Sequence, residues 1–97
     1  MKQPEDCASI EDVREAIDTI DREIIHLIGR RACYVEAAAR FKTGGQSVRA
    51  PERQSKMLAE RRRWAEENGL DQDVIEALYR NLISYFIDRE MQQLRKT

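Results

Sequence analysis

Three cations along one predicted helix point to an anion-binding interior. Arg31 stands in a row of apolar residues, where a buried guanidinium without an anion is costly. Lys42 follows eleven residues later, which is three helical turns along and close to the same face. Arg14 lies seventeen residues before Arg31 and about 100° around the helix, so it reaches the same ligand only from an antiparallel second copy of the chain. The spacing therefore predicts an anion close to Arg31.

Glu90 interrupts a second apolar stripe, near the end of the chain. It lies at helical spacing among four apolar residues: Ile83, Phe86, Ile87 and Leu94. A carboxyl group on such a stripe either pairs with a cation or takes up a proton. Arg53 falls in the first turn of another predicted helix, where the helix dipole disfavours a cation, and this favours a specific task for it.

Each of these residues also has an ordinary structural interpretation. Arg31 and Glu90 could form a buried structural ion pair. Arg14 could be a solvated arginine beside acidic neighbours, and Lys42 could complement the dipole at a helix C-terminus. The residue pattern alone indicates a helical dimer with a cationic interior and leaves these alternatives open.

The first predicted helix opens at Ser9, with Asp12 three residues on as in a capping box, and it ends near Lys42, before Thr43-Gly44-Gly45. Its apolar positions recur at gaps of three and four, the spacing of a heptad seam: Ile10, Val13, Ile17, Ile20, Ile24, Leu27, Tyr34, Ala38 and Phe41. About 34 residues at about 1.5 Å each give about 50 Å, whereas a compact chain of this size is about 32 Å across. We therefore expect the seam to continue over another subunit, in a homodimer built along this helix.

Two shorter helices complete an all-α fold of three helices per chain, since no alternating pattern is long enough for a sheet. The second is predicted to begin at Pro51 and to stop at Asn68-Gly69, and the third to be capped by Asp71. The run from Glu60 to Arg63 is predicted to be a solvated face with ion pairs between residues four apart. Trp64 is predicted to lie in the core.

Length and composition place these helices in one domain, residues 1–97, and argue against several classes of protein. Two cysteines and one histidine give little support to a disulfide scaffold or a zinc site. Charged residues make up 36% of the chain, but a net charge of −1 argues against a general nucleic-acid binder. The first residues contain no apolar leader and no long hydrophobic run follows, so we expect a cytoplasmic protein that does not enter a membrane.

The chain resembles the all-helical chorismate mutase family in three segments: DVREAIDTID at 12–21, IGRRACYVEAAARFK at 28–42 and APERQSKMLAERRRWAEENGLD at 50–71. The first segment is shared with ordinary mutases. The other two are more specific to the isochorismate-pyruvate lyase branch, which serves bacterial salicylate and siderophore synthesis. The resemblance covers nearly the whole chain, and it implies an intertwined homodimer with the chorismate mutase type II fold and two equivalent pockets.

The resemblance also assigns roles to the unusual charges. It implies that Arg14 comes from the partner subunit, that Arg31 clamps a carboxylate of the substrate, and that Lys42 contacts the ether oxygen. Arg53 and Glu90 would face the same pocket, and Lys42, Glu90 and Arg31 would be the catalytic residues. The apolar wall of the pocket would consist of Val35, Met57, Ile83, Phe86 and Ile87. The substrate would be a small enolpyruvyl dicarboxylate, and its cleavage would require no nucleophile, metal or cofactor.

Two departures bear on the activity, the first from the lyase pattern and the second from the pattern of ordinary mutases. The pattern has glutamine where this chain has Glu90, which can donate a hydrogen bond only when it is protonated. Burial favours the protonated form and nearby cations favour the carboxylate, and we expect activity to fall as the pH rises and Glu90 loses its proton. Gln54 and Ala50 stand where mutases carry Glu and Asp, and this favours the lyase. A loop from Thr43 to Ala50 could close over the substrate and exclude water.

Three functions are compatible with these residues. The favoured one is an isochorismate-pyruvate lyase that forms salicylate, with weak chorismate mutase activity. The second is a chorismate mutase that forms prephenate. The third is a non-catalytic helical dimerisation module, for which Arg31→Ala would mainly destabilise the fold, whereas both enzymes predict that activity falls by orders of magnitude while the dimer persists.

Overall fold

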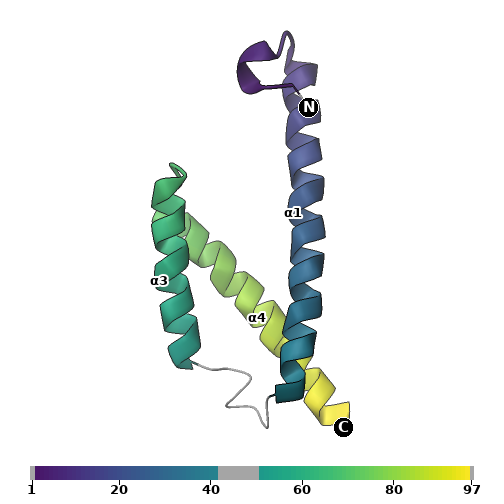
Figure 1. Ribbon diagram of the computed structural model, residues 1–97, viewed down its shortest axis with the longest axis vertical. Coiled ribbons are helices and arrows are strands. Elements are labelled where there is room, and N and C mark those ends of the chain that lie inside the picture. Colours follow the sequence, from purple (N-terminus) through teal and green to yellow (C-terminus); the bar gives the residue numbers. More distant parts are fainter. Residues whose placement is uncertain (1, 42–50, 97) are drawn as a thin grey trace. The chain divides into compact units, whose positions relative to one another are not determined.

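The computed structural model describes residues 2–41 and 51–96, and within these ranges the chain forms helices and turns but no strand. Three α-helices follow one another: α1 (Ile10–Ala38), α3 (Pro51–Glu67) and α4 (Gln72–Lys96) (Figure 1). Single turns of 3-10 helix, η1 (Pro4–Asp6) and η2 (Ala39–Phe41), flank α1. The predicted all-α fold with a long first helix is confirmed. The chain forms two compact units, residues 1–35 and 36–97, whose boundary falls within α1; the single domain stays a prediction.

The start of α1 is fixed by hydrogen bonds around Ser9 and Asp12. The backbone N–H of Asp12 donates to Ser9 Oγ at 3.2 Å, which confirms the predicted cap. The Asp12 carboxylate accepts hydrogen bonds from the backbone N–H of Ala8 at 2.9 Å and from Lys2 Nζ at 3.0 Å. The carboxylate thus reaches back one residue further than in a regular capping box. These donors, the Ala8 N–H first, hold the pKa of Asp12 below its usual value of 3.8.

The apolar seam of α1 forms as predicted, and its side chains are not buried within their own unit, residues 1–35. None of the residues of α1 is buried. The six aliphatic residues of the seam are each between 38% and 55% exposed: Ile10, Val13, Ile17, Ile20, Ile24 and Leu27. The α-helix ends at Ala38, earlier than expected, because the backbone tightens into η2 before Phe41. At 29 residues α1 is still about 44 Å long, which exceeds the width of a compact chain of this size.

The helices α3 and α4 form a hairpin whose turn is specified locally. Gly69 has a φ of 71°, a left-handed conformation that favours glycine. The N–H of Leu70 donates to the carbonyl of Ala65 at 2.8 Å and that of Gly69 to the carbonyl of Glu66 at 3.1 Å, which is a Schellman motif. Asp71 Oδ1 then accepts the N–H of Val74 at 3.0 Å and caps α4. Both predicted signals, Asn68-Gly69 and Asp71, are confirmed.

Packing between α3 and α4 forms the core of the described chain. Its buried apolar side chains are Met57, Leu58 and Ala65 on α3 and Phe86 on α4. Figure 1 shows that α4 leaves the turn and crosses α3 obliquely, so the two helices are closest near the turn. A core of four side chains is small, which agrees with the expectation that a short chain needs a supplement such as oligomerisation.

Arg62 links the two helices of the hairpin, so the prediction of a solvated run is wrong for this residue. Its Nη1 donates to Asp73 Oδ1 and to Glu76 Oε1, both at 2.9 Å, and the other oxygen of Glu76 accepts from Arg80 Nε at 2.8 Å. Hydrogen bonds from Arg80 and then Arg62 lower the pKa of Glu76, and the two carboxylates raise the pKa of Arg62. Sequence spacing missed this network because Arg62 and Glu76 lie on different helices.

Arg61 and Trp64 also differ from expectation. The guanidinium of Arg61 is half-buried over the rings of Trp64, at 4.6 Å from its centroid, and Tyr79, at 5.6 Å. Trp64 is 41% exposed, so its placement in the core was wrong; the ring lies against Arg61 instead. The remaining part of the prediction is confirmed, since Arg63 is exposed and pairs with Glu67, four residues on, at 3.9 Å.

Candidate functional site

The hairpin brings several of the predicted site residues onto one packed face. Met57 is 5%, Phe86 4% and Glu90 6% exposed. Ile83 and Ile87 are half-buried on the same side of α4. On a helix, residues three and four apart share a face, so Glu90 continues the row that Ile83 and Phe86 begin. Among the described residues it is the one charged side chain that is buried, and its place within an apolar surface agrees with the sequence.

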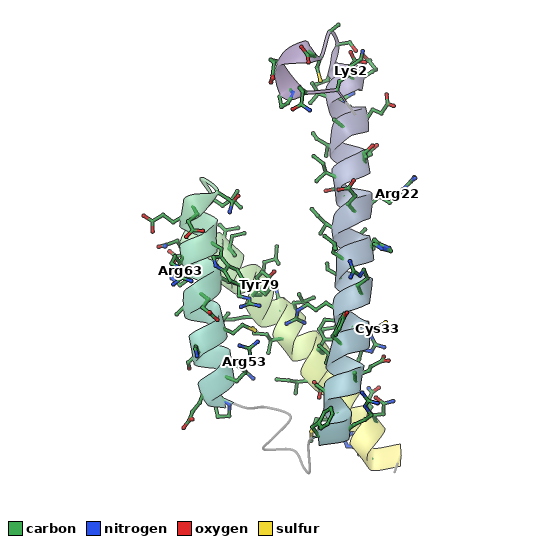
Figure 2. All side chains as sticks on the ribbon, in the orientation of Figure 1. Lys2, Arg22, Cys33, Arg53, Arg63 and Tyr79 are labelled. Atoms are coloured by element: carbon green, nitrogen blue, oxygen red, sulfur yellow. The ribbon has the colours of Figure 1, made fainter. Side chains whose placement is uncertain are left out.

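The α3 side of this face carries Arg53 and Gln54. Gln54 is half-buried, whereas Arg53 is exposed and lies on the edge of the face; Figure 2 shows its side chain on the side of α3 that α4 faces. Gln54 on α3 and Phe86 on α4 are each fourteen residues from the turn, counted from Asn68 and from Gln72. They therefore lie at about the same distance from it, roughly 21 Å. Arg53 makes no hydrogen bond or ion pair within residues 2–41 and 51–96. It is therefore available to an anionic ligand.

Two further predicted cations, Arg14 and Arg31, belong to the unit of residues 1–35. Arg31 and Val35 are half-buried on α1, and Arg14 is exposed. Arg14 lines a shallow surface depression with Glu11, Glu15, Asp18 and Arg22, yet it forms no hydrogen bond or ion pair with the parts of the chain that the structure describes. Within one chain, Arg14 thus has the environment of its ordinary interpretation, an exposed arginine beside acidic neighbours.

Arg14 and Arg31 cannot bind one small molecule from the same helix. They are seventeen residues apart on α1, which Figure 1 shows as one continuous helix. At about 1.5 Å per residue this separates them by about 26 Å along the axis. An arginine side chain spans only a fraction of that distance. If both bind the same ligand, they must come from two chains.

The remaining residues that the sequence predicts for the site are not part of the described structure. Lys42, Ala50 and the predicted loop from Thr43 to Ala50 lie outside the described residues. No three His, Cys, Asp or Glu side chains gather as a metal site would require anywhere in residues 2–41 and 51–96. None of the helices in this part of the chain is long and apolar enough to cross a membrane.

One interaction near Glu90 was missed from the sequence. Arg89 Nη2 lies 2.8 Å from Glu36 Oε1, and these residues are 53 positions apart. No local spacing signals a pair at that separation, because it depends on how residues 36–38 and α4 fold together within one unit. Only the opposite charges themselves could have suggested it.

Comparisons with known proteins agree with the helical arrangement. The family model of chorismate mutase type II matches residues 13–91. The chain is 50% identical over 97 residues to the isochorismate pyruvate lyase of Pseudomonas aeruginosa, covering 100% of this chain and 96% of that protein. It is 37% identical over 76 residues to a T-protein of Haemophilus influenzae and 32% identical over 77 residues to one of Enterobacter agglomerans. The matched segments span 77% and 78% of this chain but only 20% and 21% of those T-proteins.

Proposed function

The chain belongs to the chorismate mutase type II family, and from this premise we propose that it is an isochorismate pyruvate lyase, which releases pyruvate from isochorismate and leaves salicylate. The observation that carries the proposal is the similarity to a lyase of nearly the same length, at 50% identity over the whole chain. The T-proteins share only a domain about a fifth of their length.

The proposed reaction demands little covalent chemistry from the protein. The ether bond between the ring and the enolpyruvyl group breaks, one hydrogen passes from the ring to the methylene carbon, and that carbon becomes the methyl group of pyruvate. The ring becomes aromatic as it loses this hydrogen and the ether oxygen. The site must hold the two reacting carbons close together and stabilise negative charge on the departing oxygen.

We assign the residues to these tasks as follows. Arg31 clamps one substrate carboxylate with two parallel hydrogen bonds, and Lys42 donates to the ether oxygen. Glu90 donates a second hydrogen bond there while it is protonated. Arg53, which has no partner among the described residues, holds anionic substrate groups from α3. The ring rests against an apolar wall: Val35, Met57, Ile83, Phe86 and Ile87.

We further propose that two chains intertwine along α1 and that each pocket receives Arg14 from the partner subunit. The exposed aliphatic seam of α1 supports this, since a row of six such side chains left in water is unfavourable. The separation of about 26 Å between Arg14 and Arg31 supports it independently. A second copy in antiparallel orientation covers the seam and brings Arg14 to the other chain's Arg31. A cytoplasmic location stays a prediction.

Chorismate mutase is the second candidate, because the family model that matches residues 13–91 is that of the mutases. The position of Gln54 on the packed face of α3 favours the lyase. An amide there accepts a hydrogen bond less strongly than the carboxylate that mutases use for the ring hydroxyl of chorismate. Both reactions use a folded conformer of an enolpyruvyl ether, so weak mutase activity accompanies the lyase.

The decisive experiment is a parallel assay of the purified protein with isochorismate and with chorismate, following salicylate, pyruvate and prephenate. Rapid formation of salicylate and pyruvate in equal amounts, with slow formation of prephenate, supports the lyase. Prephenate without salicylate would assign the chain to the mutases. Absence of all three products would leave a helical dimerisation module.

A further inference from the structure

The ion pair between Glu36 and Arg89 connects the last residues of α1, which belong to the unit of residues 36–97, to α4. Glu36 lies two residues before the end of α1, and Arg89 lies within α4. Their 2.8 Å separation is short enough for a charge-assisted hydrogen bond. Neither residue is among those that we assign to substrate binding. Their contact therefore has no explanation in the proposed reaction itself.

Arg89 is held by more than this one contact. Its Nη1 lies 3.4 Å from the hydroxyl of Tyr85, and its guanidinium carbon lies 5.6 Å from the ring centroid of Tyr85 and 5.9 Å from that of Phe86. The two rings themselves are in contact, with centroids 5.0 Å apart. Packed groups thus connect Glu36 with Phe86, which is part of the proposed pocket wall.

The position of Arg89 in α4 gives this connection a consequence for the site. Arg89 directly precedes Glu90, and among the described side chains of α4 the buried ones are Phe86 and Glu90. Consecutive residues on a helix are about 100° apart. A helix whose Arg89 is tied to Glu36 therefore keeps Glu90 and Phe86 at fixed directions about its axis.

We propose that Glu36 and Arg89 are positioning residues, whose ion pair holds the last turns of α4 in the rotation that points Phe86 and Glu90 into the pocket. This inference rests on the proposed function, in which these two side chains face the substrate. The side chains of Glu36 and Arg89 are 51% and 43% exposed, and exposed ion pairs contribute little to folding stability. Removing this ion pair should therefore change the rotation of α4 without a large change in the folding stability of the protein.

Charge reversal at both positions tests the proposal. Glu36→Arg and Arg89→Glu each place like charges at the contact, and the double variant restores an attractive pair of opposite orientation. Displacing a group that acts in the transition state lowers kcat more than it changes KM, so we expect kcat to fall about tenfold in each single variant. The double variant should recover kcat to within about threefold of the wild type. Thermal melts should differ little among all four proteins.

A second exposed pair provides a matched control. Arg63 and Glu67 lie one turn apart on α3, with side chains 64% and 61% exposed, and their pair connects no two elements. Arg63→Glu, Glu67→Arg and the double variant should keep the kinetic constants of the wild type. Glu36→Gln and Arg89→Gln remove the attraction without adding repulsion, and they replace the reversals if circular dichroism shows that a reversal unfolds the chain; their kcat should fall about threefold.

The outcomes separate the inference from the proposed function. If the single variants keep the kcat of the wild type, or if the double variant is no better than the poorer single variant, the positioning role is overturned while the enzyme remains. If the wild type turns over neither isochorismate nor chorismate, the proposed function fails and the inference fails with it.

Discussion

A buried carboxylic acid makes a site sensitive to pH in a way that a buried amide does not. Glu90 is 6% exposed and sits in a row with Phe86, so its hydrogen bonds are made to a small set of groups rather than to bulk water. A carboxylate only accepts hydrogen bonds, whereas the protonated acid also donates one. The proposed role of Glu90 at the ether oxygen requires the donor form.

The first prediction concerns this proton. The proposed role requires the kcat of the wild type to be lower wherever Glu90 is a carboxylate, because only the protonated acid donates the hydrogen bond. Glu90→Gln donates at every pH, so its kcat should stay level as the pH is varied. Steady-state assays of both proteins in one set of buffers measure the difference.

Asp88→Asn serves as the control, since Asp88 is an exposed acid two residues away on α4. It should keep the pH profile of the wild type. A profile for Glu90→Gln that falls like that of the wild type would assign the titration to another group and remove Glu90 from this role.

The environment of a single residue was predictable from the sequence where it depends on neighbours in the same helix. The burial of Glu90 follows from its spacing to Ile83 and Phe86, because all three lie on the same helix. The partners of Arg61 and Arg62 were not predictable in this way. Tyr79 and Glu76 lie on the opposite arm of the hairpin, so their contacts depend on how α3 and α4 are placed side by side.

At the scale of the elements, two glycines should respond in opposite ways to the same substitution. Gly69 has a φ of 71°, and a Cβ there meets nothing within 4 Å, so Gly69→Ala suffers only from backbone strain. A left-handed alanine costs about 1–2 kcal/mol. Gly29 lies inside α1, where a Cβ also meets nothing within 4 Å. Gly29→Ala should stabilise the protein by about 0.5–1 kcal/mol, because alanine loses less backbone entropy.

Urea unfolding followed by circular dichroism measures both changes in the free energy of unfolding. Gly29 is about 200° around the helix from Leu27 and from Arg31, so it faces away from the seam and a partner chain should not alter the result. Destabilisation by both substitutions would show that Gly29 is held close to a neighbour, which contradicts the open space found beside it.

A third prediction concerns the N-terminal cap of α1. The hydrogen bonds from Ala8 and Lys2 lower the pKa of Asp12 in the folded chain below 3.8. A carboxyl group with a lowered pKa stabilises the fold fully above its unfolded pKa, and this contribution is lost as the pH falls through the folded pKa. Asp12→Asn should therefore be less stable than the wild type at neutral pH, and the difference should disappear in strong acid.

Unfolding curves at neutral and at acidic pH test this linkage. Asp6→Asn removes an exposed carboxylate from η1, whose side chain makes no hydrogen bond within the described residues, and should leave the stability unchanged at both pH values. A constant difference between Asp12→Asn and the wild type across the series would show that the charge of Asp12 contributes nothing.

The ends of the helices were the most predictable part of the fold. Ser9, Gly69 and Asp71 act through hydrogen bonds to residues within five positions, so short sequence motifs contain all the information. The end of α1 was less well predicted. The apolar seam continues to Phe41, whereas the α-helix stops at Ala38, because periodicity alone does not distinguish α from 3-10 backbone over the last turn.

At the scale of the whole molecule, the proposed sharing of Arg14 allows a complementation test. Arg14→Ala and Arg31→Ala should each lose activity by about two orders of magnitude or more. Refolded together in equal amounts, the two inactive chains form mixed dimers in half of all cases, and one pocket of each mixed dimer holds both arginines. The mixture should recover about a quarter of the wild-type activity.

The arrangement of the arginines decides the result. If Arg14 and Arg31 served one pocket from the same chain, no mixed dimer would contain an intact pocket and the mixture would stay inactive. Arg30→Ala is the control, because Arg30 is exposed beside Arg31 and makes no ion pair within the described residues. It should be fully active alone.

The exposed seam of α1 finally gives the proposed dimer a consequence that depends on the concentration of the protein. If two chains pair along this seam as proposed, α1, which has no buried residue of its own, gains stability by association, and association obeys mass action. For such a dimer each tenfold dilution lowers the apparent stability by about 1.4 kcal/mol. Melting temperature and specific activity should then both fall on dilution, so that a cell making few copies would hold a smaller share of them as working enzyme.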